Sequence, residues 1–249
     1  MTPHRLTRRL GFVFVALLAS LAGSAACSRD AAPATTESGN GGSAPASAAT
    51  GGTRSAGTGT FQIVCLGDSL TSGLGLLTDQ AYPHLVQEKF AADGYNNVEV
   101  VNAGVSGDTS AGGLRRVDQL LEADTRILVV ALGGNDALRG LTTSQTHDNL
   151  AGILAQAVNR NVAVLIAGIQ APPNLGEDYR DAFNDIFPRL LSEYRGRVML
   201  LPFLLEGVAG IPSLNQPDGI HPNADGTRIV AENFYVKLKT MVDSMGGGH

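Results

Sequence analysis

Short runs of apolar residues recur along the chain from residue 61 onward and alternate with longer amphipathic stretches. The runs are rich in Val, Ile and Leu and cover residues 61–66, 98–101, 127–132, 162–166 and 198–201. They are almost continuously apolar rather than alternating apolar with polar. This pattern predicts strands that are buried on both faces, as in a parallel sheet.

Several of the stretches between these runs have the spacing of helices. Apolar residues recur at i, i+3, i+4, i+7 and i+8 in one of them, which defines one helix face: Leu150, Ile153, Leu154, Ala157 and Val158. A last helix is predicted to begin at Asp225 and Gly226. Alternating strands and helices predict an α/β fold of three layers, α/β/α, with a mainly parallel five-stranded sheet. Residues 61–249 are ample for one such domain.

The first sixty residues have a different composition. Arg5, Arg8 and Arg9 precede an apolar run, residues 10–21, that is too short to span a bilayer. Small residues and then Cys27 follow, so residues 1–26 are interpreted as an export signal peptide. Residues 27–60 are rich in Ala, Gly, Ser and Thr and are expected to form a flexible tether.

Cys27 leaves two interpretations of the cleavage site open. The segment 24–27 resembles a bacterial lipoprotein box, in which Cys27 would become the acylated N-terminus. Ser24 departs from the leucine usual at that position, so ordinary cleavage beside Ala26 is the alternative. The first interpretation predicts an exported, membrane-anchored protein, and the second a periplasmic or secreted one.

The other cysteine, Cys65, lies in an apolar run and is interpreted as a small core residue.

Charge is distributed unequally between the two parts. The chain has 18 basic and 23 acidic residues, of which residues 1–60 hold five and two, so residues 61–249 hold 13 and 21. The net charge of −8 argues against nucleic acid as a partner. The one adjacent basic pair of this part, Arg115 and Arg116, is expected on a helix, away from the edge where the strands end. Neither a disulfide framework nor a metal cluster is predicted.

Four short blocks contain the groups that acyl transfer to water requires. They are, in chain order, Gly-Asp-Ser-Leu at 67–70, Ser-Gly-Asp at 106–108, Gly-Gly-Asn-Asp at 133–136, and Asp-Gly-Ile-His-Pro at 218–222. The first three follow predicted strands, so they are expected at the carboxyl edge of the sheet, where such folds place their active sites. Asp218 and His221 are three residues apart, which on a tight turn lets the carboxylate orient the imidazole.

Together the blocks resemble those of the SGNH branch of the GDSL hydrolases, and most closely its thioesterase I/protease I/lysophospholipase and arylesterase subgroup. The resemblance covers residues 63–234. It implies a flavodoxin-like fold and a serine esterase with a Ser69, His221 and Asp218 triad. It also implies an oxyanion hole formed by the N–H of Ser69, a glycine N–H and the side chain of Asn135. For the glycine, the match favours Gly107, although Gly104 lies in the same block.

The remaining acidic and histidine residues are given structural interpretations. Asp68, Asp108 and Asp136 are interpreted as turn and cap residues. His84 and His147 fall in predicted helices and are interpreted as surface or packing residues.

The predicted activity is hydrolysis of carboxylic esters by a monomer without cofactor or metal. Aryl esters, short-to-medium acyl esters, lysophospholipids and thioesters are the candidate small-molecule or lipid substrates. One alternative is a polysaccharide or sugar O-deacetylase of the same fold, against which the absence of Trp and the 5% aromatic content count. Another is a lipoprotein that has the fold without the activity.

Overall fold

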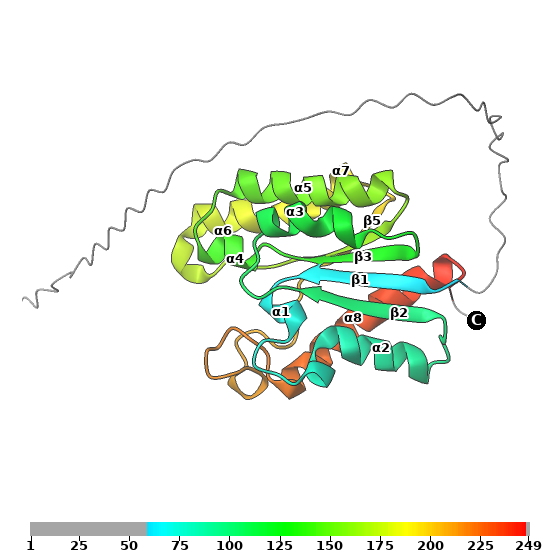
Figure 1. Ribbon diagram of the computed structural model, residues 1–249. Helices are drawn as coiled ribbons and strands as arrows, with labels where there is room; N and C mark the ends of the chain where they lie inside the picture. Colours follow the sequence, from blue (N-terminus) through cyan, green and yellow to red (C-terminus); the bar gives the residue numbers. More distant parts are fainter. Residues whose placement is uncertain (1–58, 248–249) are drawn as a thin grey trace, which may run out of the picture. The chain divides into compact units, whose positions relative to one another are not determined.

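A parallel sheet of five strands forms the middle layer of the protein (Figure 1). The computed structural model describes residues 59–247. The strands are β1 (Phe61–Gly67), β2 (Val98–Gly104), β3 (Thr125–Ala131), β4 (Ala163–Ala167) and β5 (Val198–Leu201). Their order is β2-β1-β3-β4-β5. The chain therefore moves outward from β1 in one direction and then from β3 in the other, so that a crevice can form where their loops diverge.

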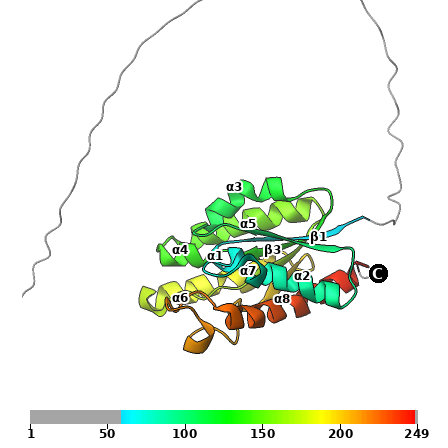
Figure 2. The ribbon, with the colours of Figure 1, turned by 60° about the horizontal axis from the view of Figure 1, so that its bottom comes forward.

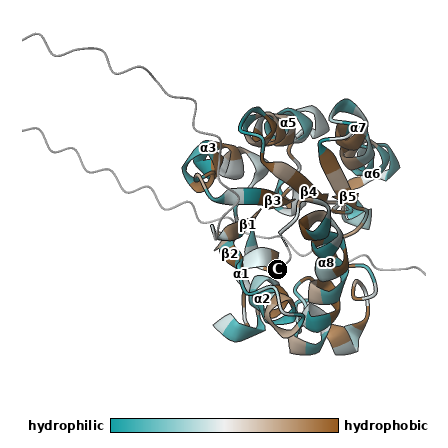
Figure 3. Ribbon diagram, turned by 90° about the vertical axis from the view of Figure 1, so that its right-hand side faces the viewer, coloured by the Kyte–Doolittle hydropathy of each residue, from teal (hydrophilic) through white to brown (hydrophobic). Residues whose placement is uncertain are grey.

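Helices cover both faces of this sheet (Figures 1 and 3). One face packs against α2 (Tyr82–Ala92) and α8 (Ala224–Ser244), and the other against α3 (Ser110–Leu120), α5 (Thr143–Asn159), α6 (Glu177–Asn184) and α7 (Ile186–Glu193). Five short elements complete the fold: α1 (Ser69–Ser72), α4 (Gly134–Leu138), η1 (Thr78–Gln80), η2 (Pro173–Leu175) and η3 (Pro212–Leu214). The predicted three-layer α/β/α fold is confirmed.

The central strand β1 explains the continuous apolar pattern. Ile63 and Cys65 pack with the α2 and α8 side, whereas Val64 and Leu66 pack with the α3 and α5 side. All four are buried, because both faces of the strand are covered. Cys65 is a free thiol of this core, and burial raises its pKa to about 12.

Aromatic packing joins the two helices of the first face, which lie side by side in Figure 2. The rings of Tyr82 on α2 and Phe234 on α8 stack with centroids 4.4 Å apart and planes 6° apart. The hydroxyl of Tyr82 also lies 3.1 Å from the hydroxyl of Thr71, which belongs to α1. The buried core therefore holds the short helix that begins at Ser69.

The structure differs from the predicted elements at their ends. Strand β2 continues to Gly104, three residues beyond its apolar run. Helix α8 begins at Ala224 rather than Asp225, because the Asn223 side chain caps it by accepting hydrogen bonds from the N–H groups of Asp225 and Gly226. Residue Val158 is only partly buried, whereas the other four residues of its predicted face are buried.

The predictions for the N-terminal segment fall outside the described residues. These are the signal peptide at 1–26, acylation of Cys27, and the tether at 27–60, of which only residues 59 and 60 are described. None of the helices within residues 59–247 combines the length and the apolar composition of a membrane-spanning helix.

Candidate active site

The four blocks meet at the carboxyl edge of the sheet. Ser69 follows the end of β1 by two residues, Gly107 follows the end of β2 by three, and Asn135 follows the end of β3 by four. Asp218 and His221 come from the loop between η3 and α8. The last loop reaches the others because its His221 ring hydrogen-bonds Ser69, 152 residues earlier in the chain.

Ser69, His221 and Asp218 form a continuous chain of hydrogen bonds. The Oγ of Ser69 lies 2.9 Å from Nε2 of His221, and Nδ1 of His221 lies 2.7 Å from Oδ2 of Asp218. The other carboxylate oxygen of Asp218 accepts the N–H groups of Ile220 and His221 at 2.9 and 3.0 Å. Three hydrogen bonds lower the pKa of Asp218 to about 2: that of the His221 N–H has the largest effect, then that of the His221 imidazole, then that of the Ile220 N–H. Asp218 is therefore ionised at neutral pH.

The loop that carries His221 is fixed to the loop that follows Ser69. The N–H of Gln216 donates to the carbonyl oxygen of His221 at 2.7 Å. The side-chain amide of Gln216 donates to the carbonyl oxygens of Leu74, at 2.7 Å, and Pro222, at 3.0 Å. Gln216 thus fixes the loop of His221 relative to the loop that follows Ser69, although it belongs to none of the four blocks.

The turn into α1 requires a glycine before Asp68. A Cβ atom at Gly67 would lie 1.9 Å from Oγ1 of Thr71, so a larger residue cannot fit without displacing α1. Asp68 then caps α1 by accepting the N–H of Leu70 at 3.0 Å. These contacts present Ser69 at the first position of the helix.

Asn135 lies at the start of α4, and its side chain points to the first block. Its Nδ2 donates to Oδ2 of Asp68 at 3.2 Å. The Asp68 side chain is buried, and burial raises its pKa to about 6. Asp68 is thus more than the cap residue that the sequence predicted, since it also orients the amide of Asn135.

The two candidate glycines of the second block have different environments. The N–H of Gly104 donates to Oδ1 of Asn102, and a Cβ atom at Gly104 would lie 2.2 Å from the backbone nitrogen of Ser72. Gly107 instead lies in an exposed turn with φ +80°. No hydrogen bond of its N–H occurs within residues 59–247.

Asp108 and Asp136 hold these loops in place, as the sequence suggested. Asp136 is fully buried and accepts the N–H of Ser110 at 2.8 Å as well as its hydroxyl. Asp108 pairs with Arg116 at 2.8 Å.

The expectation that Arg116 lies away from the site is wrong for its side chain. The guanidinium extends from α3 to the carbonyl oxygens of Ala103 and Gly67, at 2.7 and 2.9 Å, where β2 and β1 end. The sequence could not show this, because the length of the side chain lets a helical residue reach the edge of the sheet. The sequence also did not indicate that the side chain of Arg139 contacts the backbone of Gly107.

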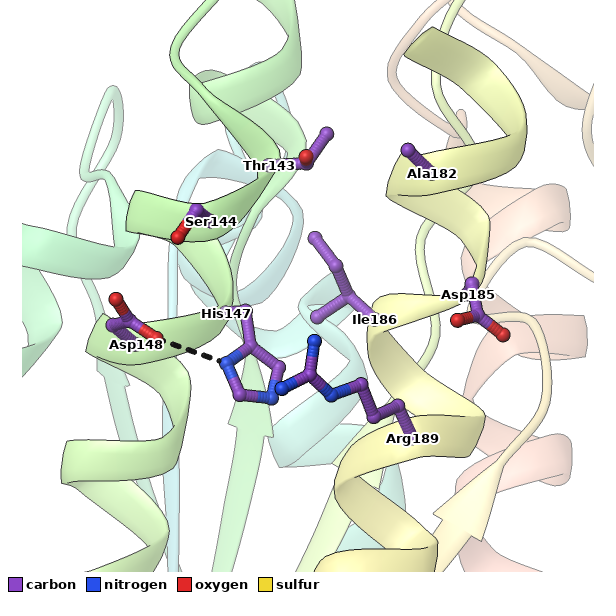
Figure 4. Close-up of a pocket in the computed structure, with 8 residues that line it drawn as sticks. All are labelled: Thr143, Ser144, His147, Asp148, Ala182, Asp185, Ile186 and Arg189. Atoms are coloured by element: carbon purple, nitrogen blue, oxygen red, sulfur yellow. Dashed lines mark hydrogen bonds and ion pairs between the residues drawn. The ribbon is translucent and has the colours of Figure 1, made fainter. Parts of the chain in front are cut away.

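His147 belongs to a different place, a polar pocket of about 260 Å³ between α5 and the helices α6 and α7 (Figure 4). Its lining contains no residue of the four blocks. The ring of His147 is buried, with Asp148 and Glu193 each 3.1 Å from one of its nitrogens. It is a packing residue, whereas His84 is exposed on α2. Among the described residues, no group of three or more His, Cys, Asp or Glu could hold a metal ion.

This arrangement contains a hydroxyl, an imidazole that can accept its proton, and a carboxylate that stabilises the resulting charge. It also contains hydrogen-bond donors, at Gly107 and Asn135, that are not required by the turn or helix that carries them. Such a set is suited to attack on a carbonyl carbon.

Comparison with known proteins agrees with this chemistry. The model of the GDSL-like lipase/acylhydrolase family matches residues 65–229. Esterase TesA of Pseudomonas aeruginosa is 41% identical over 181 residues, covering 72% of this chain and 89% of TesA. The thioesterase 1/protease 1/lysophospholipase L1 of Escherichia coli K12 is 39% identical over 182 residues, covering 73% and 85%. A crystal structure of TesA superposes with a TM-score of 0.68 at 41% identity, over 72% of this chain and 98% of TesA. The chain therefore belongs to the GDSL-like lipase/acylhydrolase family.

Proposed function

We propose that the protein is a serine hydrolase that cleaves carboxylic esters through an acyl-enzyme at Ser69. The observation that carries the proposal is the hydrogen-bonded chain from Ser69 Oγ through His221 to Asp218, with distances of 2.9 and 2.7 Å. A serine hydroxyl is a weak nucleophile until an adjacent base takes its proton, and this chain supplies that base.

In the first half-reaction, Ser69 attacks the ester carbon while Nε2 of His221 takes the hydroxyl proton. Asp218 stabilises the imidazolium that forms, and its lowered pKa keeps it ionised for this role. His221 then gives the proton to the leaving alcohol. Water then attacks the acyl carbonyl carbon and gives a proton to His221. His221 passes this proton to Oγ of Ser69 as the bond to the acyl group breaks and the acid leaves.

Negative charge on the carbonyl oxygen is stabilised by three donors: the N–H of Ser69, the N–H of Gly107 and the side-chain amide of Asn135. Gly107 is preferred to Gly104, whose N–H is already bonded to the Asn102 side chain. Donors fixed before the reaction lower its barrier because they need no reorganisation when the charge develops.

The substrates are aryl esters and short-to-medium acyl esters, with lysophospholipids as a further class. Large apolar side chains are exposed on the segments that carry the site, including Leu74, Val105, Leu138 and Ile220, at 48%, 49%, 54% and 46%. They offer an apolar surface to an acyl or aryl group. Hydrolysis rates measured side by side on aryl esters, lysophospholipids, acyl-CoAs and acetylated sugars test this assignment. A preference for acetylated sugars would indicate a deacetylase instead.

The protein is proposed to act outside the cytoplasm as a monomer, attached to the membrane through acylated Cys27. The basic and apolar N-terminal pattern supports export, and the small residues before Cys27 support acylation. A single acyl chain binds a membrane only marginally, so stable attachment needs several chains. Mass spectrometry of the mature N-terminus tests this. An unmodified N-terminus would indicate a periplasmic or secreted form.

A further inference from the structure

Arg139 bridges the two loops that carry the proposed oxyanion donors. Its Nη2 donates a hydrogen bond of 2.7 Å to the carbonyl oxygen of Gly107, 32 residues earlier in the chain. We propose that Arg139 is a positioning residue that fixes the N–H of Gly107 relative to the side chain of Asn135. The inference rests on the proposed function, because it assigns Arg139 to the oxyanion hole of that reaction.

At the Gly107 end, Arg139 completes the anchoring of a turn. The N–H of Asp108 donates to the carbonyl oxygen of Val105 at 3.0 Å, which closes a four-residue turn with Gly107 in its third position. The φ of +80° at this position fits a type II turn and favours glycine. The peptide that follows Gly107 is thus held on both sides, its N–H by Val105 and its carbonyl by Arg139.

The peptide that precedes Gly107 supplies the proposed donor. It is the central peptide of the turn, and its orientation reverses between type I and type II turns. Within the described residues, its N–H makes no hydrogen bond that would hold it in place. Its direction therefore depends on the anchoring of the turn around it, to which Arg139 contributes.

At the other end, Arg139 is joined to Asn135 through the backbone. It is the C-cap residue of α4, and its N–H donates to the carbonyl oxygen of Asn135 at 3.1 Å. A short, hydrogen-bonded path therefore runs from one proposed donor, Asn135, through Arg139 to the other, Gly107. The side chain of Asp136 also joins the two segments, but it does so through Ser110, three residues beyond Gly107.

The rival role for an exposed arginine at this edge is binding of an anionic substrate group. Arg139 forms no ion pair with a carboxylate among residues 59–247, so its charge is available for such a contact. The two roles differ in what they predict for a small, neutral substrate, because such a substrate has no anionic group to bind.

The test compares Arg139→Ala, Arg139→Lys and a control, Arg115→Ala, with p-nitrophenyl acetate and with a lysophospholipid. Arg115 is an exposed arginine of α3 without a hydrogen bond or ion pair in the described part, so its removal makes the same charge change. We expect Arg139→Ala to lower kcat on the neutral ester by about 10- to 100-fold with little change in KM, since small misplacements of catalytic groups have costs of this size. Arg139→Lys should recover part of the loss, and millimolar guanidinium should partly restore Arg139→Ala.

Three results would overturn or redirect the inference. If kcat of Arg139→Ala equals that of Arg115→Ala on the neutral ester, Arg139 does not position the donors. If the loss is confined to KM for the lysophospholipid, Arg139 binds substrate instead. A melting temperature of Arg139→Ala well below that of the control, without rescue by guanidinium, would mean a structural role. Failure of the proposed function is recognised separately, by retained activity in Ser69→Ala.

Discussion

The side-chain amide of Asn135 donates a hydrogen bond to the buried carboxylate of Asp68, the residue immediately before Ser69. The distance is 3.2 Å, and the two residues are 67 positions apart in the chain. A primary amide has two N–H groups, so the one not bonded to Asp68 is left to face the carbonyl oxygen of a substrate. The segment of the proposed nucleophile, Ser69, and one proposed oxyanion donor, Asn135, are therefore joined through a single carboxylate.

Replacing Asn135 with Ala should lower kcat by about 10²- to 10³-fold with little change in KM, because an oxyanion donor acts mainly in the transition state. Steady-state kinetics on an aryl ester measure this, with Asn159→Ala as a control at an exposed position at the end of α5. Equal kcat values for the two variants would remove Asn135 from the oxyanion hole.

Replacing Asp68 with Asn should change how stability depends on pH. The pKa of Asp68 is raised to about 6 by burial, so folding favours its neutral form. Below about pH 4, Asp68 is protonated in both the folded and the unfolded protein, so its ionisation does not affect the unfolding free energy. Above about pH 6 it is ionised in both states, and the full cost of burying the charge lowers the unfolding free energy. Asparagine does not ionise. The unfolding free energy of Asp68→Asn relative to wild type should thus rise by about 2 to 3 kcal/mol between pH 4 and pH 7.

Urea denaturation at both pH values measures this difference, with Asp124→Asn as a control at an exposed carboxylate. A relative stability that stays constant across this range would show that burial does not raise the pKa of Asp68. The same variant should lose activity at all pH values, since asparagine leaves the orientation of Asn135 less constrained.

Activity should be higher at neutral and mildly alkaline pH than at acid pH, because only a neutral imidazole can accept the serine proton. Asp218 should not change its charge in this range, since its pKa is lowered to about 2. Replacing Asp218 with Asn should lower kcat by about 10³- to 10⁴-fold, because a neutral amide neither stabilises the imidazolium nor fixes the imidazole tautomer. A kcat of Asp218→Asn near the wild-type value would argue against a role for Asp218 beside His221.

An aryl ester should be a better substrate than a long-chain acyl-CoA with respect to kcat/KM at low ionic strength. The net charge of −8 over residues 61–249 repels the polyanionic CoA group. Arg116, which reaches the edge of the site, is neutralised by its ion pair with Asp108, so Arg139 alone among the described residues offers an unpaired positive charge near the second block. Added salt should narrow the difference through screening. Faster turnover of the acyl-CoA at low salt would contradict this electrostatic argument.

The sequence predicted the fold well because the strands are buried on both faces and therefore appear as continuous apolar runs. The sequence pattern placed the end of β2 at residue 101, three residues too early. β2 is an edge strand, and its last residues, Asn102 to Gly104, are only partly buried or exposed, so they do not continue the apolar run. The residues brought together at the site were also recognisable, because each block follows a strand or precedes the last helix.

What the sequence could not show was how those blocks are connected. Gln216 reaches the carbonyl of Leu74 over 142 positions, and Arg139 reaches Gly107 over 32. Both are side-chain bonds to backbone atoms, and tertiary packing alone determines where a long polar side chain ends. An exposed arginine or glutamine has no pattern in the sequence that distinguishes this role from an ordinary surface position.

The central claim, that Ser69 is the nucleophile, is tested most directly by labelling the protein with a fluorophosphonate and locating the adduct by peptide mass spectrometry. We expect one phosphonyl group per chain, on the peptide that contains Ser69, with loss of esterase activity in proportion to labelling. Ser69→Ala should take up no label, and its kcat should be lower by about 10⁴-fold or more. An adduct on another residue, or esterase activity near the wild-type level in Ser69→Ala, would contradict the account.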